Sequence, residues 1–315
     1  MFWSRNTQRF AKADKSVVTG CVWVLTSGWT KIKINIHTIY TIFYRHIIPI
    51  ANFLLKIYIL LILSIRYLLN ILFLPKKINL YDHSNSNFEL FKKDLDYLFE
   101  YFNRDKGNYY INQYMQPIKK KNKRIDAHGY SKIYERYFEK IRNANLNVLE
   151  LGSFYGNAAG AFFYYFKNSS IYSGDICPDL FRYKSQRLKN FYINTSSEIS
   201  IKKDLIDNQR IFNVIIEDAS HTLKDQIISL FMLFKILSPK GIFICEELDF
   251  PETRKDMNIN NEYTDLKNIL KAIKSNRDFN SKYIKEEDKK YFLDNFNTIE
   301  IFKGKINEVA VIQKK

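Results

Sequence analysis

The stretch "VLELGSFYGNAAG", Val148–Gly160, passes from an apolar run into a glycine-containing turn and then into a helix-forming run. The apolar run is typical of a buried strand that ends at Glu150, and Gly152 and Gly156 allow a tight turn after it. Such a turn lets backbone N–H groups and a helix N-terminus approach a ligand closely. A second strand, "SIYSGDI", brings Asp175 to its end, 19 residues after Gly156, which is near the spacing at which an acid binds ribose hydroxyls. The stretch therefore predicts a site for a nucleoside-type cofactor.

The pattern around this turn predicts an α/β fold. Strand-like runs "NVLEL", "SIYSGDI", "NVIIED" and "GIFICEEL" alternate with helix-like runs such as "NAAGAFFYYF", "DLFRYKSQRL" and "TLKDQIISLFMLFKIL". This alternation indicates a parallel sheet with helices on both faces. The last two runs, "NTIEIF" and "EVAVIQ", are separated by a short turn and predict an antiparallel hairpin. We expect a doubly wound, Rossmann-like sheet with a terminal antiparallel hairpin.

Two of the predicted strands end in acids. "NVIIEDASH", Asn213–His221, ends beside Asp218, and "GIFICEEL" ends at Glu246 and Glu247. Ligands bind at the carboxyl ends of parallel strands, so these carboxylates are expected to meet near the cofactor, where hard oxygens suit Mg²⁺. His221 could then accept a proton from a bound hydroxyl.

Simpler interpretations of these acids stay open at this point. Asp218 or Ser220 could cap the helix that follows, and Glu246 and Glu247 could form a solvated strand end.

The glycine spacing is GxxxG rather than the GxGxxG of dinucleotide-binding folds. With ExGxxxG, the ribose acid and the final hairpin, the chain resembles the class I S-adenosylmethionine-dependent methyltransferases over about residues 105–315. The resemblance implies S-adenosylmethionine as cofactor. The residues that it implies for cofactor binding are Glu150, Gly152, Ser153, Gly156, Asp175 and Ser196.

"EDASH" together with "ICEEL" is similar to the metal-dependent O-methyltransferases of macrolide sugars and to the cephalosporin-hydroxylase-like group. That resemblance implies that His221 is the general base. It also implies Mg²⁺, held by Asp218, Glu246 and Glu247, with Asp249 as an alternative to Glu247. "DKG" at Asp105–Gly107 and "HGYSKIYERYF" from His128 resemble the entry segment of the same group, which lies near the cofactor.

The N-terminal quarter has a different composition. The chain has a net charge of +16, but residues 1–80 hold 11 lysines and arginines against one acid, Asp14. This basic part contains the apolar run Ile47–Pro75, interrupted only by Lys56 and Arg66, so an anionic membrane surface is a better partner than nucleic acid. A helix in the membrane interface, a re-entrant pair and a core helix are the alternatives. Three scattered cysteines indicate neither disulfides nor zinc.

Three regions follow from these patterns: an apolar, basic helical segment over 1–78, a helical entry segment over 79–145 and a methyltransferase domain over 146–315, with a charged lid over 251–292. The expected function is Mg-assisted O-methylation of a small-molecule or glycosyl acceptor at the cytoplasmic face of a membrane, and a homo-oligomer is compatible with the sequence. The alternatives are a non-catalytic membrane-associated adaptor and a nucleic-acid methyltransferase. The last is disfavoured because "EDASH" replaces the Asn/Asp-Pro-Pro-aromatic turn of those enzymes.

Overall fold

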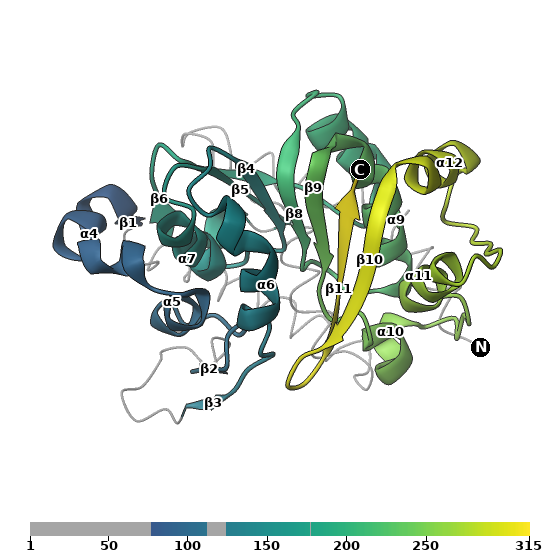
Figure 1. Cartoon of the computed structure of the whole chain (residues 1–315), viewed down its shortest axis with the longest axis horizontal. Coiled ribbons are helices and arrows are strands. Elements are labelled where there is room, and N and C mark those ends of the chain that lie inside the picture. Colours follow the sequence, from purple (N-terminus) through teal and green to yellow (C-terminus); the bar gives the residue numbers. More distant parts are fainter. Residues whose placement is uncertain (1–76, 112–123, 177) are drawn as a thin grey trace, which may run out of the picture. The chain divides into compact units, whose positions relative to one another are not determined.

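The structure is a computed structural model that describes residues 77–111, 124–176 and 178–315, all within one compact unit, Ile71–Lys315 (Figure 1). The predicted apolar segment over 47–75, and with it the membrane prediction, lies outside the described residues. Among the helices in the described ranges, none combines the length and apolarity needed to span a bilayer.

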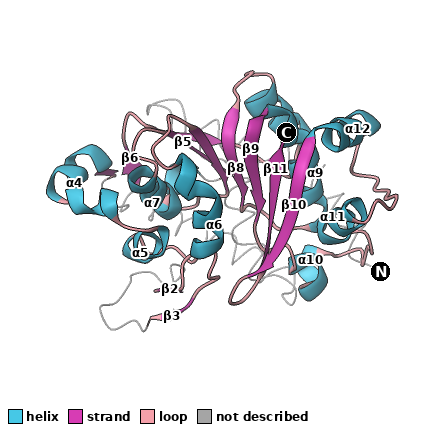
Figure 2. Ribbon diagram, viewed as in Figure 1, coloured by secondary structure: helices cyan, strands magenta, loops and turns pink. Residues whose placement is uncertain are grey.

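A seven-stranded sheet forms the centre of this unit, in the order β10-β11-β9-β8-β4-β5-β7 (Figure 2). The five strands from β9 to β7 run parallel, and β11 and β10 run antiparallel to their neighbours. This confirms the predicted doubly wound sheet with a terminal hairpin. The strands are β4 (Asn147–Leu151), β5 (Ser170–Asp175), β7 (Leu188–Tyr192), β8 (Phe212–Glu217), β9 (Leu237–Cys245), β10 (Phe296–Lys303) and β11 (Glu308–Lys314).

Helices cover both faces of the sheet, so the central strands are apolar on both sides. Successive side chains of a strand alternate between faces. Leu149 of β4 lies in one apolar cluster with α9 (Leu223–Leu233) and α11 (Leu266–Lys274), whereas Val148 lies in a second cluster with α7 (Asn157–Tyr165). In Figure 1 the two sets of helices lie on opposite sides of the sheet. The near-continuous apolar runs seen in the sequence thus supply both cores.

The remaining elements are shorter. The other helices are α4 (Leu80–Ser86), α5 (Leu95–Tyr101), α6 (Ser131–Phe138), α8 (Glu198–Ile201), α10 (Phe250–Thr253) and α12 (Glu286–Asn295). Short strands pair as β1 (Ile78–Asn79) with β6 (Tyr183–Lys184) and β2 (Tyr109–Tyr110) with β3 (Ile125–Asp126). Single 3-10 turns cover Phe88–Lys92, Glu139–Ile141, Pro178–Leu180, Phe234–Ile236 and Lys255–Met257, and a π-helical turn covers Lys202–Ile206.

The helix predicted from "DLFRYKSQRL" is wrong. This segment contains only the end of a 3-10 turn, the short strand β6 and the first residue of β7. β7 pairs with β5 as the edge strand of the large sheet, with Leu188 opposite Ile171. Pairing along a sheet edge outweighs the helix propensity of an amphipathic run.

The segment predicted as a lid, residues 251–292, is partly core. The side chains of Leu266, Ile269, Leu270 and Ile273 on α11 are buried in the apolar cluster beneath the sheet. The part between α10 and α11 is more exposed, including Ile259 and Tyr263. A covering role is therefore restricted to the first part of this segment and stays a prediction.

Candidate active site

The glycine turn after β4 is shaped by close contact with the end of β8. Gly152 has a φ of +89°, and a Cβ built on it would lie 1.8 Å from the backbone oxygen of Asp218. Gly156 has a φ of +79° and precedes the first residue of α7. Both glycines are therefore required by positive φ, and the first is also required because the two strand ends pass so close to each other.

Asp175, at the end of β5, holds this turn. One of its carboxylate oxygens accepts a hydrogen bond from the backbone N–H of Phe154, at 2.7 Å. Phe154 itself has a φ of +47°, a conformation that a bulky side chain rarely adopts without support. The predicted ribose acid is thus also the residue that fixes the turn.

Five of the six residues predicted to bind the cofactor are brought together by this turn. Glu150 is fully buried, and the hydroxyl of Ser153 lies 3.3 Å from the carbonyl oxygen of Gly174. The hydroxyl of Ser196 donates instead to the carboxylate of Asp225 in the first turn of α9. A cofactor role for all six residues stays a prediction.

Neither Asp218 nor Ser220 is the N-cap of α9, so the capping interpretation is wrong. The N-cap of α9 is Thr222, whose hydroxyl accepts from the backbone N–H of Asp225 at 3.3 Å. Glu246 and Glu247 do not form a solvated strand end either, since they are only 1% and 7% exposed. Asp218 is also buried, so all three acids need polar partners or a cation.

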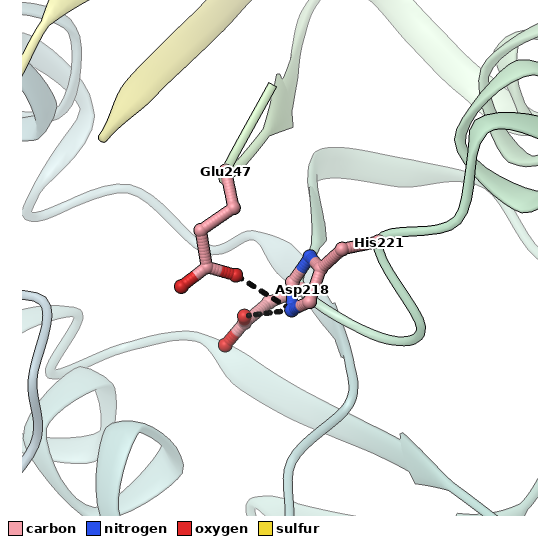
Figure 3. A group of neighbouring side chains, drawn as sticks. All are labelled: Asp218, His221 and Glu247. Carbon is pink, nitrogen blue, oxygen red and sulfur yellow. Dashed lines mark ion pairs between the residues drawn. The ribbon is translucent and has the colours of Figure 1, made fainter. Parts of the chain in front are cut away.

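Asp218, His221 and Glu247 form the core of the site at the carboxyl ends of β8 and β9 (Figure 3). Nε2 of His221 lies 2.6 Å from Oε2 of Glu247 and 3.5 Å from Oδ1 of Asp218. One ligand atom from each residue can be chosen so that all three lie within 4.8 Å of one another. His221 and Glu247 both have positive φ, 56° and 48°, which is strained backbone of the kind found at functional sites.

Two cations that sequence reasoning missed enter this site from the segment after α5. The guanidinium of Arg104 donates to Asp218, and the ammonium of Lys106 lies 2.6 Å from Asp218 and 2.5 Å from Glu246. The hydroxyl of Tyr134 donates to the same oxygen of Glu246 as Lys106 does. The "DKG" motif contains Lys106, but the sequence of this motif does not show that the lysine is buried.

His128, from the predicted entry segment, is a second imidazole beside the site. Its Nε2 lies 3.0 Å from Oε1 of Glu247. The amide nitrogen of Asn307 lies 3.1 Å from Nδ1 of His128 and donates to it. Nδ1 therefore accepts, and Nε2 carries the proton that points towards Glu247. The ring also stacks on Tyr130, with the two centroids 5.3 Å apart. Glu247 thus lies between two imidazoles.

The site holds more acidic than basic groups. Four buried carboxylates, Glu150, Asp218, Glu246 and Glu247, face two permanent cations, Arg104 and Lys106. Burial and the nearby Asp218 raise the pKa of Glu246 to about 8. Burial lowers the pKa of His221, but Glu247 and Asp218 outweigh it and raise that pKa to about 9. Both directions are those expected of a site with an excess of negative charge.

The donor set fits a divalent cation. Nδ1 of His221 and Oε2 of Glu150 are buried without a hydrogen-bond partner among the described residues, and Oε2 of Glu247 faces the His221 imidazole. Carboxylate oxygens are the ligands that Mg²⁺ prefers, and an imidazole beside them widens the choice to Mn²⁺ and other transition metals. Asp218 and Glu247 would be two of the ligands.

Glu217, the last residue of β8, gives a prediction for stability. Burial, with Asp218 nearby, raises its pKa to about 7, and the thiol of Cys245 lies 3.5 Å from its Oε2. The folded protein therefore binds this proton more tightly than the unfolded chain does. Stability from it is complete below the ordinary glutamate range and is lost as the pH rises through 7.

Glu217→Gln should therefore be more stable than the parent protein at pH 8, by a few kcal/mol at most, and the gain should vanish near pH 4. Melting temperatures measured in EDTA between pH 4 and pH 8 check this. Glu139→Gln, at an exposed position, is the control and should show no pH-dependent gain. A lower stability of Glu217→Gln than of the parent protein at pH 8 contradicts the prediction.

A curated protein and solved structures are similar to parts of this chain. No family model matches the chain. A curated protein of Streptomyces olivaceus, 8-demethyl-8-alpha-L-rhamnosyl tetracenomycin-C 2'-O-methyltransferase, is 28% identical over 128 residues, which cover 38% of this chain and 33% of that protein. The similarity thus spans about a third of that relative's length.

Solved structures of MycE, a methyltransferase of the mycinamycin biosynthetic pathway, have a similar fold. The complex with Mg and S-adenosylhomocysteine (SAH) matches with a TM-score of 0.52 and 18% identity, over 70% of this chain and 55% of that chain. The complex with Mg, SAH and mycinamycin VI matches with a TM-score of 0.53 and 16% identity, over 70% and 54%. The chain thus covers about half the length of these proteins, and this likeness establishes the fold.

The sheet order, the glycine turn with its strand-end acid and the similarity to MycE agree on the fold. The chain has the fold of the class I S-adenosylmethionine-dependent methyltransferases, as its motifs predicted.

Proposed function

We propose that this protein is an enzyme that transfers a methyl group from S-adenosylmethionine to a hydroxyl of a glycosyl or other small acceptor, assisted by a divalent metal. The observation that carries the proposal is the group formed by Asp218, His221 and Glu247, which adjoins the glycine turn of a methyltransferase fold. The rhamnosyl O-methyltransferase of S. olivaceus and the Mg- and SAH-bound MycE support the acceptor class and the metal.

Asp218, Glu246 and Glu247 are the proposed metal ligands. Lys106 and Tyr134 occupy one oxygen of Glu246, and a carboxylate offers a second. A bound Mg²⁺ would lower the pKa of an acceptor hydroxyl and orient it. No observation among the described residues favours a nucleic-acid methyltransferase.

His221 is the proposed base. Its Nε2 points into the group of acids, and it is the nitrogen that would face an acceptor there. The acceptor oxygen forms a bond to the methyl carbon, the bond from that carbon to sulfur breaks to leave SAH, and the hydroxyl proton passes to Nε2. To accept it, His221 must be neutral, so the negative charge that raises its pKa has to be offset in the working site.

Asp175 gives a prediction for the cofactor. Asp175→Ala should weaken binding of SAH by about 10-fold or more, because charge-assisted hydrogen bonds to ribose are worth about 1.5–3 kcal/mol. Calorimetry with SAH measures this. Asp175 also accepts from Phe154 N–H, so Asp175→Asn is the matched variant that keeps an acceptor for the turn. Affinity unchanged in both variants would remove Asp175 from the cofactor site.

One experiment separates the proposed enzyme from a non-catalytic adaptor. SAH binding is measured first, and methyl transfer from labelled S-adenosylmethionine is then followed with nucleotide sugars, glycosylated macrolides and glycolipid extracts, with Mg²⁺ and with EDTA. The proposal expects binding, and turnover that EDTA abolishes. Cofactor binding without turnover on any acceptor favours the adaptor, and turnover insensitive to EDTA contradicts the metal.

Attachment of the N-terminal segment to the cytoplasmic face of a membrane is a separate proposal, supported only by its charge and apolar sequence. Co-sedimentation of the full chain with vesicles that contain anionic lipid, compared with neutral vesicles, tests it. Equal recovery with both kinds of vesicle would argue against an anionic surface.

A further inference from the structure

Lys106 is one of the most deeply buried charged side chains among the described residues. It is 0% exposed, and its ammonium lies 2.6 Å from Oδ2 of Asp218, 2.5 Å from Oε1 of Glu246 and 3.5 Å from Oε1 of Glu150. These three acids end three adjacent parallel strands, β8, β9 and β4. A single ammonium therefore bridges the ends of the strands that form the site.

The backbone around Lys106 is fixed in the same way. The N–H groups of His128, Gly129 and Tyr130 donate to the carbonyl oxygens of Asp105, Gly107 and Lys106, each at 2.8 Å. The segments 105–107 and 128–130 are thus joined by backbone hydrogen bonds, which fix the backbone position from which the Lys106 side chain extends.

Burying a lysine costs several kcal/mol unless its partners compensate. Core stability alone does not require this arrangement, because well-packed apolar groups often replace a buried ion pair without loss. Two of the three donors of the ammonium are used on acids proposed as metal ligands. Hydrogen bonds to ligating carboxylates orient them, and loss of such a partner typically lowers metal affinity about 10–100-fold.

We propose that Lys106 is a positioning residue that holds Asp218 and Glu246 in the orientation in which they bind the metal. This inference rests on the proposed function, since it presupposes a metal at these acids. The ammonium touches neither acceptor nor cofactor in this role. It acts through the two carboxylates, with Tyr134 as the second donor to Glu246.

Lys106→Met keeps the length and apolar stem of the side chain and removes the ammonium. Asp218, Glu246 and Glu150 then repel one another without a shared donor, and their side chains lose the common orientation. We expect the dissociation constant for Mg²⁺, titrated alone by calorimetry, to rise about 10–100-fold. The gain in net negative charge acts in the opposite direction, so tighter binding of Mg²⁺ by this variant would overturn the proposal.

Lys314→Met is the matched control. This lysine is also buried, and its ammonium donates to the carbonyl oxygens of Phe234 and Leu237 and to the hydroxyl of Tyr291, with no acid among these partners. It should lower the melting temperature yet leave the Mg²⁺ dissociation constant unchanged. If both variants lost Mg²⁺ affinity equally, the effect of Lys106→Met would come from lost stability and not from the lost orientation of the carboxylates.

Tyr134→Phe tests the same idea if Lys106→Met does not fold. It removes one hydrogen bond to Glu246 and no charge, so Mg²⁺ affinity should fall by several-fold in a folded protein. Unchanged affinity overturns the proposal. If the proposed function is wrong, the parent protein itself binds no Mg²⁺. If only this inference is wrong, the parent protein binds Mg²⁺ and the variant binds it equally well.

Discussion

Replacement of His221 by alanine is expected to lower turnover about 10²–10⁴-fold, the usual contribution of a positioned general base. The affinity for SAH should change little, because the imidazole points to the acids and not to the glycine turn. The remaining rate should rise with pH, since solvent then takes more of the hydroxyl proton. Initial rates from pH 6 to pH 10 at saturating cofactor and Mg²⁺ measure both effects.

Mg²⁺ affinity decides between two roles for the same imidazole. His221 lies within the group that could hold a metal, so it could be a ligand instead of the base. As the base, it can be removed without loss of Mg²⁺ affinity; as a ligand, it cannot. His83→Ala is the control, because that histidine of α4 contacts Tyr164 and Tyr101 and none of the acids. Near-normal turnover in His221→Ala would exclude both roles.

Replacement of Glu247 by glutamine is expected to raise the Mg²⁺ concentration needed for half-maximal activity about 10-fold or more. Loss of a residue that orients a metal ligand lowers metal affinity about 10–100-fold, and loss of the ligand itself should lower it at least as much. The change keeps the size of the side chain but removes its charge and one oxygen. Glu247 is a cleaner choice than Asp218, whose loss would remove one buried acid from both Arg104 and Lys106. Calorimetric titration with Mg²⁺ alone measures the affinity directly.

Glu246→Gln tests the third proposed ligand. If its second oxygen binds the metal, Mg²⁺ affinity should fall as in Glu247→Gln. If Glu246 serves only as the acceptor for Lys106 and Tyr134, the variant should bind Mg²⁺ normally and melt at a lower temperature. The second result would restrict the metal ligands to Asp218 and Glu247, and Glu139→Gln provides the baseline for both titrations.

The sequence by itself determined the sheet, apart from the edge strand β7, and the edge of the sheet at which the site lies. Alternation of apolar strands with helices specifies a parallel sheet, and the carboxyl ends of parallel strands lie at one edge. The acids that end β4, β8 and β9 therefore had to meet there, and Glu150, Asp218 and Glu246 do so around one ammonium. Local signals were sufficient because each of these residues is tied to a strand end.

Only the tertiary structure decided which side chains complete the site. Lys106 lies 112 residues before Asp218 and 140 before Glu246, and its burial depends on how a segment outside the sheet folds over it. His128 lies beside Glu247 because its own segment, residues 128–129, packs against Gly304 and Lys305 in the turn of the final hairpin. Such contacts depend on packing between distant parts of the chain, and no periodicity or spacing in the sequence encodes them.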